Sequence, residues 1–408
     1  MRLDWTPDRL AGLFSGLAEQ LPDAIALRRA LHSAPRVGGD ESETTRMLLD
    51  TLGMEHELLS EGGALVRVGS AVGPAIGLRA ELDALPIVER TDVSWRSRGE
   101  AMHACGHDVH MAAAVAVART LQTAGAPVPL LLLLQPREEV LPSGALDLRE
   151  SPAFKAHDVR AVVGVHLQPR LAQGHFAATG GAVNAAADQF TIVVHGQPGH
   201  AAYPHLTADP VVAAADLIGT LQHLVSRRVD PTNPTVLTIG TIEGGKSHNV
   251  VPAAVRMSGI LRTFHEEERT QLHRAIKDTA HAIAGVYGCT AEVQLSLGAP
   301  VLDNDPTLAT TAAARIEHAG LVPAAPHRSC GADDFSYYCS VCPSLMVFVG
   351  VGTGGVDQPG LHHPRFLPPD DSVGEVATAM LAAYLGACET VAGVDLPGTE
   401  VFSRHVRR

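Results

Sequence analysis

The stretch PLLLLLQPREE, residues 129–139, decides how the rest of the chain is interpreted. Five consecutive leucines between Pro129 and Gln135 are far too few to span a bilayer, and they predict a strand that is buried on both faces. Adjacent residues of an extended chain point to opposite sides, so Glu138 and Glu139 are expected to diverge. One carboxylate could then bind a metal while the other faces a substrate as a base. Paired acids are also common in solvated loops, and that interpretation stays open.

Strands and helices alternate on both sides of this stretch. Helical or strand patterns occupy residues 26–35, 41–53, 64–69, 75–80, 110–122 and 160–168. Of these segments, the first two and residues 110–122 have helical spacing, and the others are short apolar runs typical of strands. This alternation predicts an α/β sheet with helices on both faces.

The pattern changes after Gly181 and changes back near Pro300. Strand, helix, strand, strand, helix and strand are predicted in turn for residues 188–196, 209–227, 235–245, 254–264, 266–288 and 289–298. That order is ferredoxin-like. We therefore predict one α/β domain formed by residues 1–185 and 299–408, interrupted by an inserted α+β domain at residues 186–298.

The bulk composition argues against several classes of protein. The 408 residues include 46% hydrophobic residues and carry a net charge of −13, whereas nucleic-acid binders usually present a basic face. No secretory pattern and no long apolar run is visible, so neither a membrane nor a nucleic acid is expected as a partner. Six cysteines are too few for a disulfide framework, and a cytoplasmic location is expected.

The densest group of metal-ligating side chains lies in MHACGHDVHM, residues 102–111. Cys105 and His107 are two residues apart, so on an extended segment their side chains would point the same way. Asp108 and His110 follow directly. Thiolate and imidazole suit zinc and the metals that resemble it, although a polar loop with accidental histidines is the alternative.

Two further histidine sites follow apolar segments. His166 stands near the end of a predicted strand, where a lone histidine is more often structural. His362 and His363 lie in the loop PGLHHPRF, which could equally be a surface turn. Sites of open α/β sheets gather at the carboxyl ends of strands, so these segments and the two acids reinforce one another.

Taken in this order, the motifs resemble the dinuclear-metal aminoacylase and carboxypeptidase family. The similarity is greatest to its branch of hippurate hydrolases, N-acyl-amino-acid amidohydrolases and auxin-conjugate hydrolases. It covers nearly the whole chain, through RRALHSAP, LRAELDALPIVE, MHACGHD, QPREE, VGVHLQP, GHAAYPHLTADPV, IEGGKSHNVVP, RTF and LHHPRF. The resemblance implies a mixed-sheet, metallopeptidase-like catalytic domain with an inserted ferredoxin-like lid and dimerisation domain, and hence a homodimer.

The resemblance also implies roles for individual residues. Two divalent ions, of zinc, manganese, cobalt or nickel, would be held by Cys105, His107, Glu139, His166 and His362. Cys105 would bridge the two ions. Glu138 would be the general base, and Asp83 would orient a metal ligand. His200 would stabilise the oxyanion, and Asn249 and Arg262 would hold the free carboxylate of the substrate.

The chain departs from the family pattern at two informative positions. Glu81 replaces the first Asp of the usual RADMDALP motif, and Arg137 stands where relatives usually have a small residue. We expect these changes to leave the metal chemistry intact. They leave the shape of the acyl pocket open.

The implied activity is metal-dependent hydrolysis of the amide bond of an N-acyl-L-amino acid or similar conjugate, releasing a carboxylic acid and an amino acid. A dipeptidase or an N-carbamoyl-amino-acid hydrolase of the same family is the first alternative. A nucleotide-binding protein is another, because GTIEGGKS at residues 240–247 fits a phosphate-loop pattern. That motif requires a helix after Ser247, where a turn and a strand are predicted. A metal-binding protein without activity is the last alternative.

Overall fold

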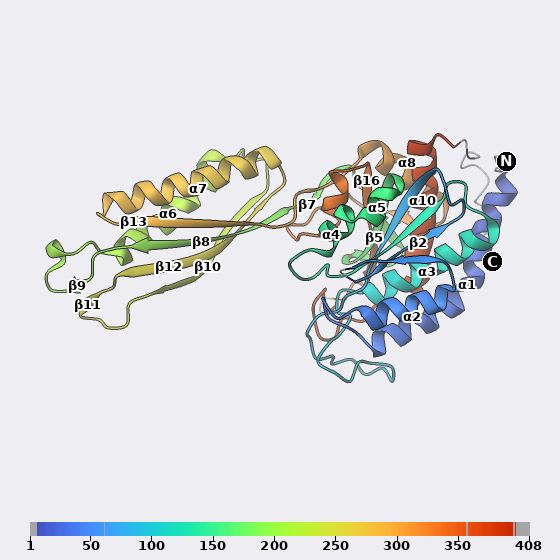
Figure 1. Cartoon of the computed structure of the whole chain (residues 1–408), viewed down its shortest axis with the longest axis horizontal. Helices are drawn as coiled ribbons and strands as arrows, with labels where there is room; N and C mark the ends of the chain where they lie inside the picture. The colour runs from blue at the N-terminus through green and yellow to red at the C-terminus, as the bar shows by residue number, and fades with distance from the viewer. Residues whose placement is uncertain (1–5, 61, 356–357, 395, 397–408) are drawn as a thin grey trace. The chain divides into compact units, whose positions relative to one another are not determined.

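The chain, described by a computed structural model for residues 6–60, 62–355, 358–394 and 396, forms two compact units. The main unit contains the residues up to Gly181, Asp303–His327 and the residues from Asp334 onward. The inserted unit contains Ala182–Leu302 and Arg328–Asp333 (Figure 1). The domain limits that the sequence places after residues 185 and 298 stay a prediction.

An eight-stranded mixed sheet forms the centre of the main unit, in the order β1-β2-β4-β3-β5-β16-β6-β15. Its strands are β1 His56–Leu58, β2 Ala64–Val68, β3 Pro74–Glu81, β4 Leu130–Gln135, β5 Asp158–Ala172, β6 His175–Ala177, β15 Val322–Pro323 and β16 Ser344–Gly352. The four strands β4, β3, β5 and β16 are mutually parallel, whereas β1, β2 and β6 join antiparallel. The predicted α/β class with a mixed sheet is confirmed.

Strand β4 shows why the leucine run is so apolar. Leu130, Leu132 and Leu134 belong to the core that α1, α3, α8 and α10 cover on one face. Leu131 and Leu133 are equally buried but point to the other face, where α4 packs on β4 and α9 packs on β16. The helices are α1 Pro7–Ser33, α2 Ser42–Leu52, α3 His107–Ala124, α4 Gly144–Glu150, α5 Pro152–Ala156, α8 Pro306–His318, α9 Ser336–Cys339 and α10 Asp371–Ala392.

The inserted unit has the predicted ferredoxin-like order. Its elements are β8 Ala186–His195, α6 Pro210–Arg228, β10 Thr235–Gly244, β12 Ala254–Thr263, α7 Glu266–Val286 and β13 Thr290–Leu297. The antiparallel sheet runs β10-β12-β8-β13, and α6 and α7 share one apolar core with it. A small ribbon pairs β9 Gly199–His200 with β11 Val250–Val251, next to the 3-10 helix η1 Pro204–Leu206.

The chain first enters the inserted unit on one short strand and leaves it on another, and the later segment Arg328–Asp333 also belongs to that unit. β7 Gly181–Asn184 and β14 Leu302–Asn304 form a two-stranded sheet of their own. The exit from the main unit and the return to it are therefore hydrogen-bonded neighbours, about 5 Å apart.

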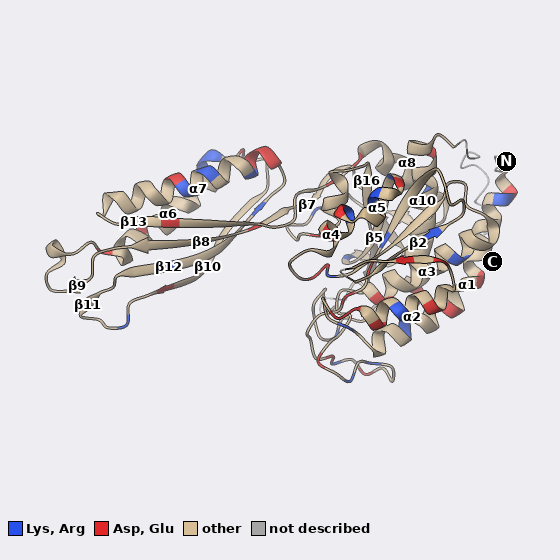
Figure 2. Ribbon diagram, in the orientation of Figure 1, with Lys and Arg blue, Asp and Glu red and all other residues tan. Residues whose placement is uncertain are grey.

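The fold contradicts the alternative that the chain binds a nucleotide through residues 240–247. Ser247 is followed by the short strand β11 and then by β12, so the GTIEGGKS segment does not open a helix, as a phosphate loop must. Both signs of charge occur along α2 and α7, and the first turn of α7 holds three glutamates (Figure 2). Among the described residues, no helix is long and apolar enough to cross a membrane.

Candidate metal centre and active site

Side chains from four separate segments meet at the carboxyl edge of the parallel strands. Asp83 follows β3, Glu138 and Glu139 follow β4, and His166 lies on β5. Because β3, β4 and β5 run parallel, these positions share one edge of the sheet. Cys105, at the start of the segment that leads into α3, reaches the same edge, where its Sγ lies 3.4 Å from His166 Nε2.

Several groups of possible metal ligands result, and three of them consist of residues that the sequence analysis singles out. The ligand atoms of Cys105, His107 and His166 lie within 4.8 Å of one another. The same holds for Cys105 with Glu139 and His362, and for His107 with Glu138 and Glu139. Cys105 belongs to two of these groups, which fits a thiolate that bridges two ions.

His107 has the geometry of a ligand whose tautomer is fixed. Its Nδ1 donates to the backbone carbonyl of Asp83 at 2.8 Å, and Asp83 Oδ1 lies 3.6 Å from the same nitrogen. Its Nε2 is buried and has no hydrogen-bond partner among the described residues. Burial opposes the charged ring, but the hydrogen bond to Asp83 and the charge of Glu81 raise the pKa of His107 to about 10. The surroundings of His107 therefore favour a positive charge at or beside its ring.

The Cys105 thiol also indicates that a cation belongs in this site. Burial, followed by the negative charges of Glu139 and Glu138, raises the pKa of Cys105 well above the ordinary thiol value. A thiolate at this position needs a cation beside it. Sulfur, nitrogen and oxygen donors together suit zinc and its borderline neighbours, so the residues present fit divalent metal ions.

Residues 77–387 match the model of Peptidase family M20/M25/M40. The chain belongs to this family. It is 33% identical over 376 residues to an N-acetyldiaminopimelate deacetylase of Shouchella clausii, covering 90% of this chain and 99% of the relative. It is 35% identical over 367 residues to an N-acetyl-L-cysteine deacetylase of Bacillus subtilis, covering 86% and 84%.

A solved structure agrees with the sequence relatives. A Bacillus subtilis protein, described as a dinuclear metal binding peptidase from M20 family, superposes with a TM-score of 0.78 at 29% identity. The match covers 90% of this chain and 99% of that protein. The predicted family, the fold with its inserted domain and the assignment to amide-bond hydrolases are thus confirmed.

The two adjacent acids do not diverge as the extended pattern predicts. β4 ends at Gln135, and Arg137 has a φ of 54°, so the alternation of a strand no longer applies at Glu138 and Glu139. Both carboxylates instead come within 4.8 Å of a His107 nitrogen. The prediction that they face opposite sides was wrong because the left-handed residue turns the chain.

Cys105 and His107 converge as expected, but for a different reason. Gly106 between them has a φ of 86°, and His107 is already the first residue of α3. The segment is therefore a tight turn into a helix and not an extended strand. A glycine is required there, since a Cβ at Gly106 would lie 2.6 Å from Leu167 Cδ1.

His110 forms a further group of possible metal ligands with Glu81 and His107, but hydrogen bonds engage both of its ring nitrogens. Its Nδ1 donates to Glu81 Oε2 at 3.1 Å, and its Nε2 accepts the Leu167 N–H at 3.1 Å. Arg79 forms an ion pair with the other oxygen of Glu81. The longer carboxylate at Glu81 thus joins Arg79 to His110, a role that the sequence pattern did not reveal.

His362, rather than His363, reaches the cluster. His362 Nε2 lies 3.0 Å from Glu139 Oε1, whereas His363 Nδ1 accepts the Arg365 N–H at 3.1 Å. His362 also has a positive φ of 62°, and its backbone N–H donates to the Ala104 carbonyl at 2.8 Å. This bond fixes the loop beside the Cys105 segment.

A second buried network lies behind the cluster and was missed by the sequence analysis. Asp108 Oδ2 accepts from Arg28 Nε at 3.1 Å and from His32 Nδ1 at 2.9 Å. His32 Nε2 lies 3.1 Å from Glu89 Oε1. Burial opposes the charged ring of His32, yet the two carboxylates raise its pKa to about 9. The partners are distant in sequence, so no local spacing could have identified them.

Three predicted site residues lie in the inserted unit. His200 is exposed on β9, and its Nδ1 accepts the Ala202 N–H at 3.0 Å. Asn249 lies beside it, with its backbone carbonyl accepting the Ala201 N–H at 3.0 Å. Arg262 lies on β12 opposite Ala187, near the end where the chain enters the unit.

Arg262 is far from His200 within the inserted unit. Ala254, which pairs with His195 at the end of the sheet nearer β9, precedes Arg262 by eight residues on β12, which is about 26 Å of strand. Burial lowers the pKa of Arg262 from its usual value, and the carboxylate of Asp188 opposes that shift.

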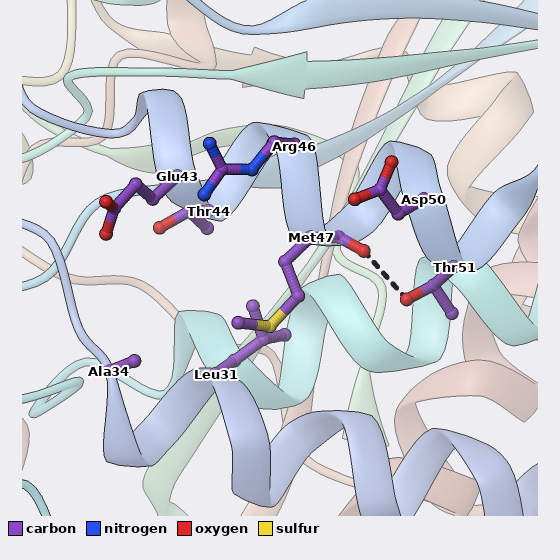
Figure 3. A pocket seen from close by; sticks show the side chains of 8 residues that line it. All are labelled: Leu31, Ala34, Glu43, Thr44, Arg46, Met47, Asp50 and Thr51. Carbon is purple, nitrogen blue, oxygen red and sulfur yellow. Dashed lines mark hydrogen bonds between the residues drawn. The ribbon is translucent and has the colours of Figure 1, made fainter.

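A surface hollow elsewhere on the main unit contains none of these residues. It lies between the end of α1 and α2, and its lining includes Leu31, Met47 and the charged residues Glu43, Arg46 and Asp50 (Figure 3). The candidate chemistry is therefore located by the convergence of donor atoms and not by this opening.

Proposed function

We propose that this M20-family chain hydrolyses the amide bond of an N-acyl-L-amino acid or a similar conjugate, releasing a carboxylic acid and an amino acid. The observation that carries the proposal is the gathering of Cys105, His107, Glu139 and His166 around Glu138. The two deacetylases named above act on N-acetylated amino acids by their descriptions, which supports the substrate class.

Five residues would hold two divalent ions of zinc, manganese, cobalt or nickel: Cys105, His107, Glu139, His166 and His362. Bound ions of this kind polarise the scissile carbonyl and lower the pKa of a water molecule. His166 is prepared for this role, because its Nδ1 donates to the Leu167 carbonyl at 2.8 Å and leaves Nε2 toward Cys105. Asp83 plays the corresponding part for His107 by fixing the ring.

Glu138 would act as the general base and then as the general acid. Its side chain is 9% exposed, and its Oε2 lies 3.9 Å from His107 Nε2. In this position it can take a proton from the attacking water and deliver it to the leaving amine nitrogen. The main-unit side chains thus provide both the ligand set and the proton carrier.

The inserted unit would supply the contacts to the rest of the substrate. Arg262 offers a planar guanidinium that can bind a carboxylate through two parallel hydrogen bonds. Asn249 would add an amide donor to the same carboxylate. His200 would donate to the oxygen that becomes negatively charged during attack, which it can do from Nε2 because Nδ1 already accepts the Ala202 N–H.

We further propose a homodimer formed through the inserted unit. His200 and Arg262 are too far apart on one unit to contact one small substrate, so a site that uses both needs a His200 from a second copy. The surface near His200 also exposes large apolar side chains, namely Tyr203, Leu206, Val211, Val212, Ile242 and Val250. Measuring the mass in solution by light scattering tests this, and a monomer at micromolar concentration would contradict it.

A reducing compartment is the proposed location. All six cysteines are free thiols, which is typical of cytoplasmic proteins.

The proposal is tested by measuring metal content and substrate range together. The protein is purified without chelator, its metals are quantified, and it is assayed on N-acetyl, N-benzoyl and longer N-acyl amino acids. Dipeptides and N-carbamoyl amino acids in the same panel address the alternative activities. We expect two metals per chain and amino-acid release that chelation abolishes and added metal restores. Preference for a dipeptide or a carbamoyl substrate would replace the proposed substrate class, and a metal-loaded protein without any hydrolysis would refute the activity.

A further inference from the structure

The turn that carries Glu138 contains one residue in an unfavourable backbone conformation. Arg137 has a φ of 54°, in the left-handed region that residues with a Cβ avoid. Such a conformation persists only where the surrounding structure holds it. Because Arg137 directly precedes Glu138, its conformation sets the direction in which the Glu138 side chain leaves the turn.

A buried carboxylate holds this conformation. Glu41, which is 4% exposed, immediately precedes helix α2. Its Oε1 accepts the Arg137 N–H at 2.8 Å, and its Oε2 accepts the Gly39 N–H at 2.8 Å. Hydrogen bonds to a carboxylate are stronger than those between neutral groups, so Glu41 ties the turn firmly to the loop before α2.

The loop and the turn are packed without spare room. A Cβ added at Gly38 would lie 2.6 Å from Val140 Cγ2 and 3.3 Å from Asp83 Oδ2. On the other side of Glu138, Asp83 Oδ2 accepts the Glu139 N–H at 2.9 Å. The backbone is therefore fixed both before and after Glu138, by Glu41 and by Asp83.

The side chain of Arg137 is a weaker support for the turn. Its Nη2 lies 2.6 Å from Asp147 Oδ2, but the Asp147 side chain is 37% exposed, and ion pairs in contact with solvent contribute little. The backbone hydrogen bond to Glu41 is better shielded from water, because Glu41 is only 4% exposed.

We propose that Glu41 is a positioning residue for Glu138: its carboxylate keeps Arg137 left-handed and so directs the Glu138 carboxylate into the metal cluster. The inference rests on the proposed role of Glu138 as the base. Glu41 itself acts only through the backbone of the turn.

The test compares two double variants. Glu41→Ala is expected to lower kcat about 100-fold through misplacement of Glu138, with KM within about threefold. Adding Arg137→Gly should recover at least about tenfold of this loss, since glycine adopts the left-handed conformation without support. Adding Arg137→Ala instead removes the same ion pair with Asp147 but keeps a Cβ, so it should recover nothing. Metal content and melting temperature are measured for every variant.

Two control variants are expected to keep nearly unaltered turnover. Arg137→Gly alone should keep kcat within about threefold of the unaltered protein, and so should Glu43→Ala, which removes an exposed carboxylate from the same segment. If Glu41→Ala does not fold, Glu41→Gln takes its place: the amide has one oxygen for the two N–H donors of Arg137 and Gly39, so the turn is held less firmly, kcat should fall by less than in Glu41→Ala, and Arg137→Gly should again recover more of it than Arg137→Ala.

Two results would overturn the inference. One is a folded, metal-loaded Glu41→Ala protein with unaltered kcat. The other is a deficit that Arg137→Gly does not relieve more than Arg137→Ala does. The Glu138→Gln variant separates these failures from failure of the proposed function. If Glu138→Gln keeps normal turnover, the base assignment is wrong, whereas an inactive Glu138→Gln together with no recovery refutes the role of Glu41 alone.

Discussion

The sheets of the two units differ in how completely they are covered, and the candidate site residues differ accordingly. Every residue of β4 in the main unit is buried, and so is every residue of β3 except Pro74. In the inserted unit, β13 has no buried residue and β10 has one. The proposed metal ligands thus gather at one edge of a sheet packed on both faces, whereas Arg262, a proposed substrate contact, stands on a sheet with one open face.

The candidate site residues of the two units also differ in how firmly they are held by their neighbours. In the main unit, Asp83 accepts hydrogen bonds from His107 and from the Glu139 N–H, and the Glu139 carboxylate lies 3.0 Å from His362 Nε2. In the inserted unit, His200 is exposed, and its side chain accepts the Ala202 N–H of its own turn. We infer that the main unit is preorganised for chemistry, and that the inserted unit gains its functional contacts when substrate and a second copy bind.

The largest effect should come from the proposed base in the main unit. Glu138→Gln removes the proton carrier but preserves the shape of the side chain, so kcat should fall about 1000-fold while both metals stay bound. Turnover of the metal-loaded variant is compared with that of Glu43→Gln, an exposed control. Near-normal turnover would show that another group carries the proton.

The next largest effect is on the free energy of unfolding. It comes from His32, in the buried network with Asp108 and Glu89, and it depends on pH. The folded pKa of His32, about 9, lies above its ordinary value of 6.5, so its protonated form stabilises the fold fully below pH 6.5. That contribution is lost as the pH rises through 9 and amounts to at most roughly 3 kcal/mol. The unfolding free energy of the native protein minus that of His32→Gln should therefore be larger at pH 6 than at pH 10. A difference that does not change with pH would contradict a charged His32.

In the inserted unit, His200→Ala should lower kcat about 100-fold through loss of one oxyanion donor. His205→Ala, in the same exposed segment, is the control. Mixing His200→Ala chains with Glu138→Gln chains gives a sharper result. If His200 serves the partner's site, each hybrid dimer contains one complete site, and activity should rise above that of either variant alone. Absence of any rise, with hybrid dimers demonstrated, would place His200 in the site of its own chain.

The smallest effect is expected at the substrate carboxylate. Arg262→Ala should raise KM about tenfold and change kcat less, because the contact is present in both the bound substrate and the transition state. Arg256→Ala removes an exposed charge from the same face of β12 and should leave KM unchanged. Equal effects of the two variants would indicate a general loss of positive charge rather than a carboxylate site.

Much of this arrangement could be predicted from local patterns, and the rest depends on contacts distant in sequence. The leucine run of β4 and the strand and helix order of the inserted unit follow from periodicity, which is a local property. The directions of Glu138 and Glu139 could not follow from it, because Arg137 adopts a conformation that its residue type disfavours. The contact that we propose to hold that conformation comes from the carboxylate of Glu41, 96 residues earlier.

Local sequence patterns likewise could not show which histidines can bind a metal. The sequence shows that His107 and His110 lie close together, but not which of them has a free nitrogen. His110 is excluded as a ligand by Glu81 and by the backbone of Leu167, which belong to two other strands. His362 and His363 are distinguished in the same way, by the 3.0 Å approach of His362 to Glu139.

The pairing of β7 with β14 has a consequence for how such a protein could be assembled. Because β7 and β14 are hydrogen-bonded neighbours, the two ends of the segment between them are held close together. The entropy cost of closing a loop grows only slowly with its length, so a longer or shorter segment between these strands costs little extra free energy. The inserted segment can therefore change in length without moving the points at which it leaves β7 and joins β14.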